Sequence, residues 1–266
     1  MIRAWEVTVE RGGRRLLDGV NAMAECGEWL VIVGANGAGK TTLLHTLSGE
    51  IAPCHGRVTW KGEALRAFKP VDLARQRASL SQHVSCALPF RALEIVLLGA
   101  EAGGARGRAA YELAAGSMEQ SGTAHLCDRL MESLSGGEQQ RVHWARVLAQ
   151  LGGEYEGKCL LLDEPISSLD LGHQYEMLDL ARSVARAGAA VVAVLHDLNL
   201  AAEYADRAVL LQRGRVIGDG KPAEVFTPEA IAQAFGVSVR VEANPVSERP
   251  WILVDRGANP AAVTTP

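Results

Sequence analysis

A glycine-rich stretch beside a lysine and two threonines carries the strongest chemical signal in the sequence. It reads GANGAGKTT, over residues 34–42. Glycines leave room for backbone N–H groups to turn toward phosphate oxygens, and a following helix adds partial positive charge at its N-terminus. Lys40 would reach the β- and γ-phosphates of a nucleotide, and Thr41 would offer a hydroxyl to Mg²⁺. The residues assigned to this phosphate loop are Gly34, Ala35, Asn36, Gly37, Ala38, Gly39, Lys40, Thr41 and Thr42.

A pair of acidic residues follows the apolar run in CLLLDEP. In a parallel sheet, Asp163 and Glu164 would emerge at the edge where nucleotides bind. Asp163 suits the surroundings of Mg²⁺, and Glu164 suits polarising an attacking water. Taken alone, the pair fits equally well two surface acids after a core strand. Beside a phosphate loop, it favours nucleotide hydrolysis.

Two further polar residues lie where buried segments end. His196 closes the run AAVVAVLHD, and at the tip of a third parallel strand it would be level with Glu164 and contact the γ-phosphate. Gln82 lies in SLSQH, where the strand-rich part of the chain gives way to helical patterns. A neutral amide there can contact a metal or a water without titrating.

A second glycine-containing loop, LSGGEQQ, covers residues 134–140. Ser135, Gly136 and Gly137 precede a helix expected to start near Glu138. One interpretation is a second anion-binding helix N-terminus with a hydroxyl donor. The other is that Ser135 only caps the helix while the glycines form its turn.

The elements that position these residues follow from the periodicity of apolar residues. WEVTVE alternates like a strand, RGGRR is typical of a turn, and residues 30–33 form a run typical of a strand buried on both faces. KTTLLHTLSG predicts a helix ended by Gly49. With KCLLLDEP and AAVVAVLHD as further buried strands, the pattern predicts an α/β fold whose mostly parallel sheet is covered by helices.

Residues 83–150 show helical patterns instead. These are FRALEIVLLG, YELAAGSMEQSG and EQQRVHWARVLAQL. In the last of them, four apolar residues fall on one face: Val142, Ala145, Leu148 and Ala149. The basic connector GGARGRAA between the first two predicts an exposed loop.

These patterns predict one domain over residues 1–266. Residues 1–82 and 151–235 form a nucleotide-binding core, residues 83–150 a helical subdomain that carries LSGGEQQ, and residues 236–266 a tail. The tail contains two strand-like pieces, VSVRVE and PWILVD.

The composition excludes several classes of protein. With 48% hydrophobic and 22% charged residues, the 266-residue chain is ordinary for a globular protein. A net charge of −4 argues against a nucleic-acid partner, because such proteins usually carry a basic excess. No apolar run approaches the about eighteen residues of a membrane span, so we expect any membrane role to depend on a partner. Five scattered cysteines without a C-x-x-C pair indicate a reducing cytosol.

Together the motifs make the chain resemble the nucleotide-binding subunit of ATP-binding-cassette transporters. GANGAGKT resembles Walker A, CLLLDEP Walker B, LSGGEQQ the family signature and SSLD the D-loop, while Gln82 resembles the Q-loop glutamine and His196 the switch histidine. The resemblance implies a P-loop NTPase core with an N-terminal antiparallel β subdomain and an inserted α-helical subdomain.

It also implies ATP and Mg²⁺ as ligands and a head-to-tail homodimer with two ATP molecules between the subunits. Glu164, His196 and Gln82 would be catalytic, and Thr41, Gln82 and Asp163 would surround Mg²⁺. The phosphate loop of one subunit would face the signature of the other. The residues implied to act in trans are Ser135, Gly136, Gly137 and Asp170.

The chain departs from the family pattern before the phosphate loop. The family stacks adenine on an aromatic residue there, whereas the matching VTVERGGRR has no aromatic between Trp5 and Trp29. Val9 or Arg11 is left to cover the base, Arg11 through its planar guanidinium.

Within the family, HDLNLAAEYADRAVLLQRGRV resembles bacterial importers of iron complexes and cobalamin, and LPFRALEIVLLG resembles haem importers. The resemblance implies a location on the cytoplasmic face of the inner membrane, two copies of a permease and, indirectly, a periplasmic haem-binding protein. A groove for the permease would lie over residues 83–98, including Leu88 and Phe90. Ferric siderophore and cobalamin remain alternative cargoes, and a soluble ATPase that acts on nucleic acid or ribosomes is an alternative of another class.

Overall fold

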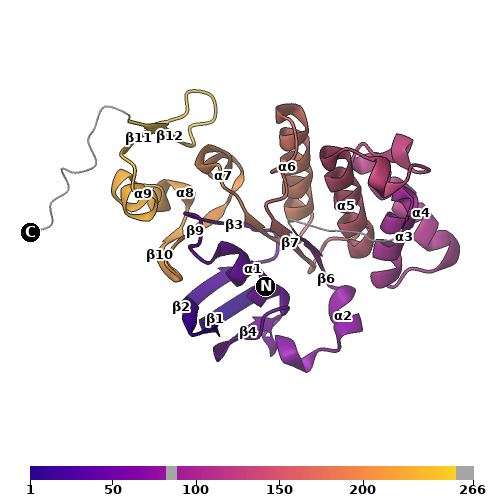
Figure 1. Ribbon diagram of the computed structural model, residues 1–266, viewed down its shortest axis with the longest axis horizontal. Coiled ribbons are helices and arrows are strands. Elements are labelled where there is room, and N and C mark those ends of the chain that lie inside the picture. The colour runs from indigo at the N-terminus through magenta and orange to yellow at the C-terminus, as the bar shows by residue number, and fades with distance from the viewer. Residues whose placement is uncertain (82–88, 256–266) are drawn as a thin grey trace, which may run out of the picture. The chain divides into compact units, whose positions relative to one another are not determined.

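A computed structural model describes residues 1–81 and 89–255 (Figure 1). The chain divides into two compact units. The first unit comprises Met1–Ile2, Ala24–Glu28 and Trp60–Ala193. The second unit comprises Arg3–Met23, Trp29–Thr59 and the chain from Val194 onward.

The second unit begins with an antiparallel hairpin. Strand β1 (Ile2–Arg11) leads through Gly12 and Gly13, with φ of 56° and 73°, into β2 (Arg14–Ala24), and β4 (His55–Trp60) lies on the other side of β1. Two adjacent residues with positive φ form the turn that matches the twist of paired strands. The predicted turn at RGGRR is therefore confirmed.

A second set of strands in this unit holds the phosphate loop. Every residue of β3 (Trp29–Gly34) is buried, as its continuous apolar run predicts. Strand β9 (Arg207–Gln212) lies parallel to β3, with Gly34 opposite Leu211, and β10 (Arg215–Gly220) lies antiparallel to β9. Helix α1 (Lys40–Ser48) follows the loop and ends at Gly49, whose φ of 77° is left-handed.

The rest of the second unit is C-terminal. Helices α7 (Leu198–Tyr204), α8 (Pro222–Val225) and α9 (Pro228–Phe235) precede a hairpin of β11 (Val239–Ala243) and β12 (Pro250–Val254). The two strand-like pieces of the tail are thus confirmed as a pair. Asn199 of α7 bonds to β12, so the hairpin packs on that helix.

The first unit contains the other parallel strands. Strands β6 (Arg77–Leu80) and β7 (Cys159–Asp163) pair in parallel, with Arg77 opposite Cys159, and β8 (Ala190–Val194) lies on the far side of β7. All residues of β7 and β8 are buried. Helix α2 (Pro70–Ala74) precedes β6, and α6 (Leu171–Arg186) lies between β7 and β8 in the sequence. The short strand β5 (Glu63–Ala64) and the 3-10 turn Leu65–Ala67 come before α2.

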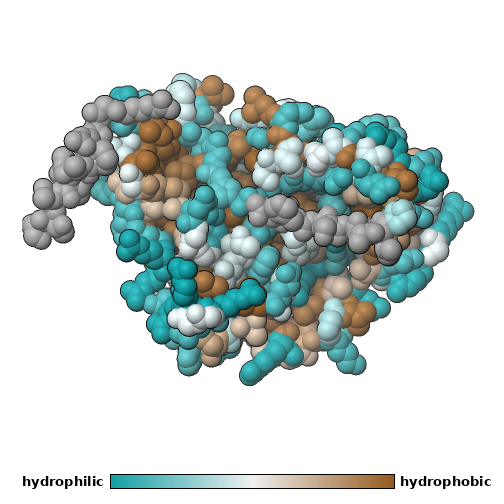
Figure 2. All heavy atoms as spheres, viewed as in Figure 1, coloured by the Kyte–Doolittle hydropathy of each residue, from teal (hydrophilic) through white to brown (hydrophobic). Residues whose placement is uncertain are grey.

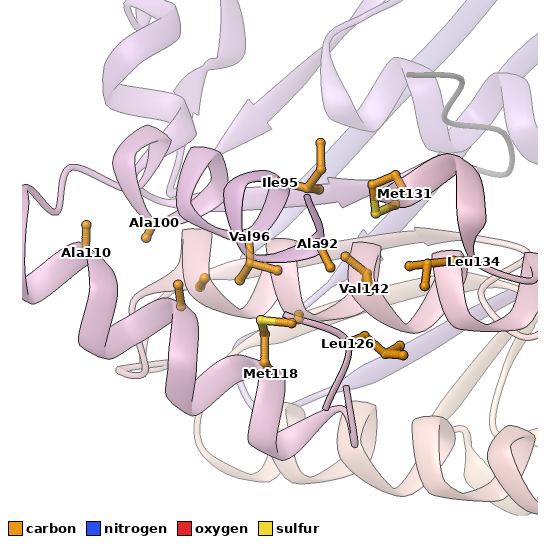
Figure 3. Packing of buried hydrophobic residues seen from close by; sticks show 13 residues of the cluster. Ala92, Ile95, Val96, Ala100, Ala110, Met118, Leu126, Met131, Leu134 and Val142 are labelled. Carbon is orange, nitrogen blue, oxygen red and sulfur yellow. The ribbon is translucent and has the colours of Figure 1, made fainter. Parts of the chain in front are cut away.

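Three helices of the first unit pack around a core of their own. They are α3 (Ala92–Ala102), α4 (Gly107–Gln120) and α5 (Gly136–Leu151) (Figure 3). The 3-10 turns Ala124–Leu126 and Met131–Ser133 join α4 to α5. The face predicted from EQQRVHWARVLAQL is confirmed, because all four of its apolar residues are fully buried: Val142, Ala145, Leu148 and Ala149.

Helices α3 and α5 approach each other at two glycines. A Cβ on Gly99 or Gly103 would lie under 3.0 Å from the carbonyl oxygen of Arg146 or Gln150, respectively. The two backbones are therefore in direct contact at positions one turn apart on α3.

The exposed connector predicted at GGARGRAA is only half right. Residues 103–106 precede α4, but Gly107 begins the helix and Ala110 is 1% exposed in the helical core. The alanines at the end of the connector favour a helix, and the predicted loop boundary came four residues too late.

Hydrophilic residues cover most of the face seen in Figure 2, and hydrophobic ones emerge between them in small groups. Among the described residues, no helix combines the length and the apolar character that crossing a bilayer requires. The predicted α/β class, with parallel strands and an N-terminal antiparallel subdomain, is confirmed.

Candidate functional site

The phosphate loop connects β3 to α1 within the second unit. Its glycines have left-handed or otherwise positive φ, with 152° at Gly34, 78° at Gly37 and 105° at Gly39. A Cβ on Gly34 would collide with the carbonyl oxygen of Leu211, and one on Gly39 would lie 2.8 Å from that of Leu16. Neighbouring backbone therefore requires glycine at two of the three positions, and the third requires it for its φ.

Strand β2 and the turn between β9 and β10 support this loop from outside. Gly214 in that turn donates its N–H to the carbonyl of Ala38 at 2.9 Å and accepts one from Asp18 of β2 at 2.9 Å. Asp18 also pairs with Arg215, at 2.6 Å. The sequence patterns did not indicate these contacts. The Arg213–Gly214 pair between two strand-like runs is the sequence signal that could have revealed the hairpin, and its φ values of 47° and 79° form the turn.

Lys40 places a cation inside the phosphate loop. Its side chain is buried, and its Nζ donates to the carbonyls of Gly34 and Ala35 at 2.9 and 3.1 Å. Helix α1 has no acidic residue in its first turn, and Gly39 gives it no side-chain cap. The positive end of α1 therefore lies beside a buried ammonium, an environment that fits an anionic phosphate.

The acidic pair lies in the first unit, at the end of β7. Asp163 is 2% exposed, whereas Glu164 is half-buried and has a left-handed φ of 49°. The residues after them form a turn, in which Ser167 N donates to the carbonyl of Glu164 at 3.3 Å. The predicted position of both carboxylates, directly after a buried strand, agrees with the structure.

The signature loop lies in the same unit and caps α5. Ser135 Oγ accepts from Glu138 N at 3.3 Å, while Glu138 Oε2 accepts from Ser135 N at 2.8 Å. The backbone N–H of Ser135 lowers the pKa of the Glu138 carboxyl below its ordinary value. Gly136 and Gly137 form the first turn of α5, so the helix begins two residues earlier than the sequence indicates. The capping interpretation of Ser135 is correct, and an exposed helix N-terminus with this hydroxyl can also receive an anion.

Asp170 caps the next helix, α6. Its carboxylate accepts from His173 N at 3.0 Å and contacts His173 Nδ1 at 2.9 and 2.8 Å. The hydrogen bond from the backbone of His173 lowers the pKa of Asp170, and Asp170 is exposed.

His196 lies in the second unit, two residues after β8 ends. Leu195 N donates to the carbonyl of Ile32 at 3.3 Å, so this part of the chain runs beside β3 toward the end that carries the phosphate loop. The imidazole of His196 is exposed, and Asp197 caps α7 directly after it.

Three other predicted residues have different outcomes. Gln82 and Leu88 lie outside the described residues, whereas Phe90 packs with part of its side chain on the helical core. Of the two residues considered for adenine, Val9 is 4% exposed within its sheet and Arg11 is exposed.

The ABC transporter sequence profile matches residues 17–167, which include the phosphate loop, the signature and the acidic pair. The chain belongs to the ABC transporter family. Its predicted ATPase activity and its fold, a P-loop core with β and α-helical subdomains, are those of the ATP-binding subunits of this family.

Comparisons over the whole chain agree with this ABC transporter assignment. The hemin import ATP-binding protein HmuV of Agrobacterium fabrum is 46% identical over 95% of this chain and 98% of its own. A solved metal-chelate type ABC transporter in an inward-facing conformation has a TM-score of 0.78 at 24% identity and covers 96% of each chain. The cassette MJ0796, solved as a dimer with ADP and Pi, has a TM-score of 0.73 at 25% identity and covers 84% of this chain and 99% of its own.

Proposed function

We propose that this chain is the ATP-hydrolysing subunit of a bacterial hemin importer, working as a head-to-tail homodimer beneath two permease subunits. The observation that supports hemin as the cargo is the 46% identity, over nearly the full length of both chains, to a protein named for hemin import. A location at the cytoplasmic face of the inner membrane follows from attachment to the permease. A periplasmic hemin-binding protein would supply the cargo from the other side.

The buried Lys40 and the N-terminus of α1, which has no acidic residue in its first turn, support ATP binding at the phosphate loop. Of the nine residues assigned from the sequence, Gly34 ends β3, the next five connect it to α1, and Lys40, Thr41 and Thr42 begin α1. Arg11 is exposed on the strand expected to face the base. A guanidinium plane can stack on a nucleobase as an aromatic ring does. Arg11 is therefore our candidate for covering adenine, in place of Val9.

Thr41, Asp163 and Gln82 would hold Mg²⁺ together with nucleotide phosphates. Among the described residues, no cluster of three or more His, Cys, Asp or Glu could hold a metal without other ligands. Mg²⁺ usually takes one or two protein ligands together with substrate phosphates and water, so such a cluster is not required. When bound, Mg²⁺ would offset the charge that develops on the phosphates.

Hydrolysis requires an attacking water and a contact to the γ-phosphate. Glu164 would orient and polarise the water through its carboxylate, and His196 would hydrogen-bond the γ-phosphate. The half-buried Glu164, directly after the buried Asp163, supports the first role, and the exposed imidazole of His196 supports the second. Gln82 would contact Mg²⁺ or the water.

The signature would complete the site of the second copy. Ser135 and the N–H groups of Gly136 and Gly137 would receive the γ-phosphate in trans, and Asp170 would lie at the same interface. The exposed N-terminus of α5 supports this arrangement. Loss of the γ-phosphate removes the shared ligand, so hydrolysis would open the dimer.

Growth on hemin as the sole iron source tests this function. A strain that lacks the chain is complemented with wild type, Lys40→Ala or the control Lys69→Ala, which removes an exposed lysine. Wild type and the control should grow, Lys40→Ala should not, and all three should grow on inorganic iron. Growth of Lys40→Ala on hemin would contradict ATP-dependent import. If the chain is required for growth on ferric siderophore or for uptake of cobalamin, but not for growth on hemin, then that compound and not hemin is the cargo.

A further inference from the structure

Gln140 of α5 uses both ends of its side-chain amide on the loop after β7. Its Nε2 donates to the carbonyl oxygen of Glu164 at 3.2 Å, and its Oε1 accepts from Ser168 Oγ. An amide supplies a donor and an acceptor on one rigid group, which neither a carboxylate nor an alkyl side chain does. Gln140 therefore joins the signature helix to both ends of residues 164–168.

The backbone at Glu164 needs such support. Its φ of 49° is in the left-handed region, which strains a residue with a Cβ and persists only where the surroundings hold it. Its carbonyl also accepts from Ser167 Oγ at 3.2 Å and Ser167 N at 3.3 Å. This carbonyl is thus the anchor of the turn, and Gln140 is the donor that reaches it from another element.

The neighbours of Gln140 on α5 contact the same loop. Gly137 and Trp144 lie three positions before and four after it, so the three residues form one stripe along the helix. Trp144 is fully buried, and its Nε1 donates to the carbonyl of Pro165 at 3.1 Å. A Cβ on Gly137 would lie 3.2 Å from the carbonyl oxygen of Ser168. A whole face of α5 is therefore packed on the loop.

We propose that Gln140 is a positioning residue for Glu164, because it fixes the main chain from which the carboxylate projects. The inference rests on the proposed function, which assigns the attacking water to Glu164. In the proposed dimer, Ser135 at the start of α5 serves the nucleotide of the partner, while Glu164 serves the nucleotide of its own subunit. One helix would then connect the γ-phosphate at one site to the hydrolytic carboxylate at the other.

The test compares steady-state ATP hydrolysis by full-length variants. Gln140→Leu removes both bonds, and Gln140→Glu keeps the length and an acceptor but loses the donor to Glu164. Both should lower kcat about tenfold while the KM for ATP stays within about twofold, because the nucleotide binds elsewhere and only the orientation of the carboxylate changes. Gln150→Leu is the matched control, since Gln150 lies on the same helix and donates to Ala74 and Arg77 at 2.9 and 3.0 Å.

Glu164→Gln, measured alongside, separates this inference from the proposed function. Normal hydrolysis by Glu164→Gln would overturn the role of Glu164 and, with it, the inference. If Glu164→Gln is inactive while Gln140→Leu keeps its kcat, only the inference is wrong. It is also wrong if Gln150→Leu loses as much kcat, or if both Gln140 variants lose nucleotide binding and thermal stability together. The double variant Gln140→Leu with Glu164→Gln should be no slower than Glu164→Gln alone.

Discussion

Asn199 and Ile252 exchange two hydrogen bonds. Asn199 Nδ2 donates to the carbonyl of Ile252 at 3.2 Å, and Ile252 N donates to Asn199 Oδ1 at 2.7 Å. The side chain of α7 thus occupies the place of a neighbouring strand beside β12. This contact joins the C-terminal hairpin to α7. That helix begins directly after His196 and Asp197, and Asp197 is its N-cap.

Asn199→Asp should loosen the hairpin. The substitution replaces the donor with a carboxylate oxygen that faces the carbonyl of Ile252, and we expect a loss of about 1–3 kcal/mol of local stability. Hydrogen exchange of the β11 and β12 amides measures it. Asn244→Asp is the control, because Val246 N bonds to Oδ1 of Asn244, an acceptor that aspartate keeps. Equal exchange in the two variants would contradict the role of Asn199.

Gly34→Ala and Gly37→Ala should differ in stability. The Cβ added by Gly34→Ala would collide with the Leu211 carbonyl and push β3 from β9. We expect this to lower the free energy of unfolding by about 2–3 kcal/mol. At position 37 no atom lies within 4 Å, and only the strain of positive φ remains, about 1 kcal/mol. Urea unfolding of the two variants measures the difference, and a Gly37→Ala protein as unstable as Gly34→Ala would argue against it.

Ser135→Arg should separate nucleotide binding from dimer closure. A large cation at the start of α5 removes the hydroxyl and blocks the surface proposed for the partner's γ-phosphate, while the phosphate loop of the same chain is unchanged. ATP affinity of the monomer should stay within about twofold. ATP-driven dimerisation, measured by sedimentation in the Glu164→Gln background, should disappear.

Ser133→Arg provides the control for that experiment. Ser133 is exposed two residues earlier and donates only to the carbonyl of Leu130 among the bonds described. We expect Ser133→Arg to dimerise. Equal losses of ATP binding and dimerisation in Ser135→Arg would place the signature at the nucleotide of its own subunit.

His143 should make stability depend on pH. Burial lowers its pKa from 6.5 to about 4, with a smaller effect from the charge of Arg146, and its Nδ1 is buried without a hydrogen-bond partner among the described residues. Because the unfolded chain binds the proton more readily, the stability present above pH 6.5 falls as the pH drops toward 4, by about 3 kcal/mol in total.

His143→Leu should remove most of this pH dependence, since leucine fills a similar volume and takes up no proton. Urea unfolding at about pH 7.5 and about pH 5 measures the slope for each variant. The exposed His125→Leu serves as the control and should keep the slope of the wild type. An unchanged slope in His143→Leu would show that other groups cause the dependence.

The sequence allowed the local part of this structure to be predicted. The phosphate loop depends on glycines and a lysine within nine adjacent positions, and β7 and β8 depend on unbroken apolar runs, so both have local signals. The placement of β9 beside β3 has none, because Gly34 and Leu211 are distant in the sequence and their register is set by packing. The hydrogen bond between Gln140 and Glu164 likewise has no signal in the sequence, because it requires α5 to pack on the turn after β7.

The glycines in and directly after α3 have a mechanical consequence. Because Gly99 of α3 and its C-cap Gly103 bring the backbone against that of α5, neither helix can slide or roll on the other without atomic overlap. A force applied where α3 begins, at Arg91, would therefore turn both helices as one stiff lever. Its other arm ends at Ser135, so displacement at one end would reach the signature with little loss.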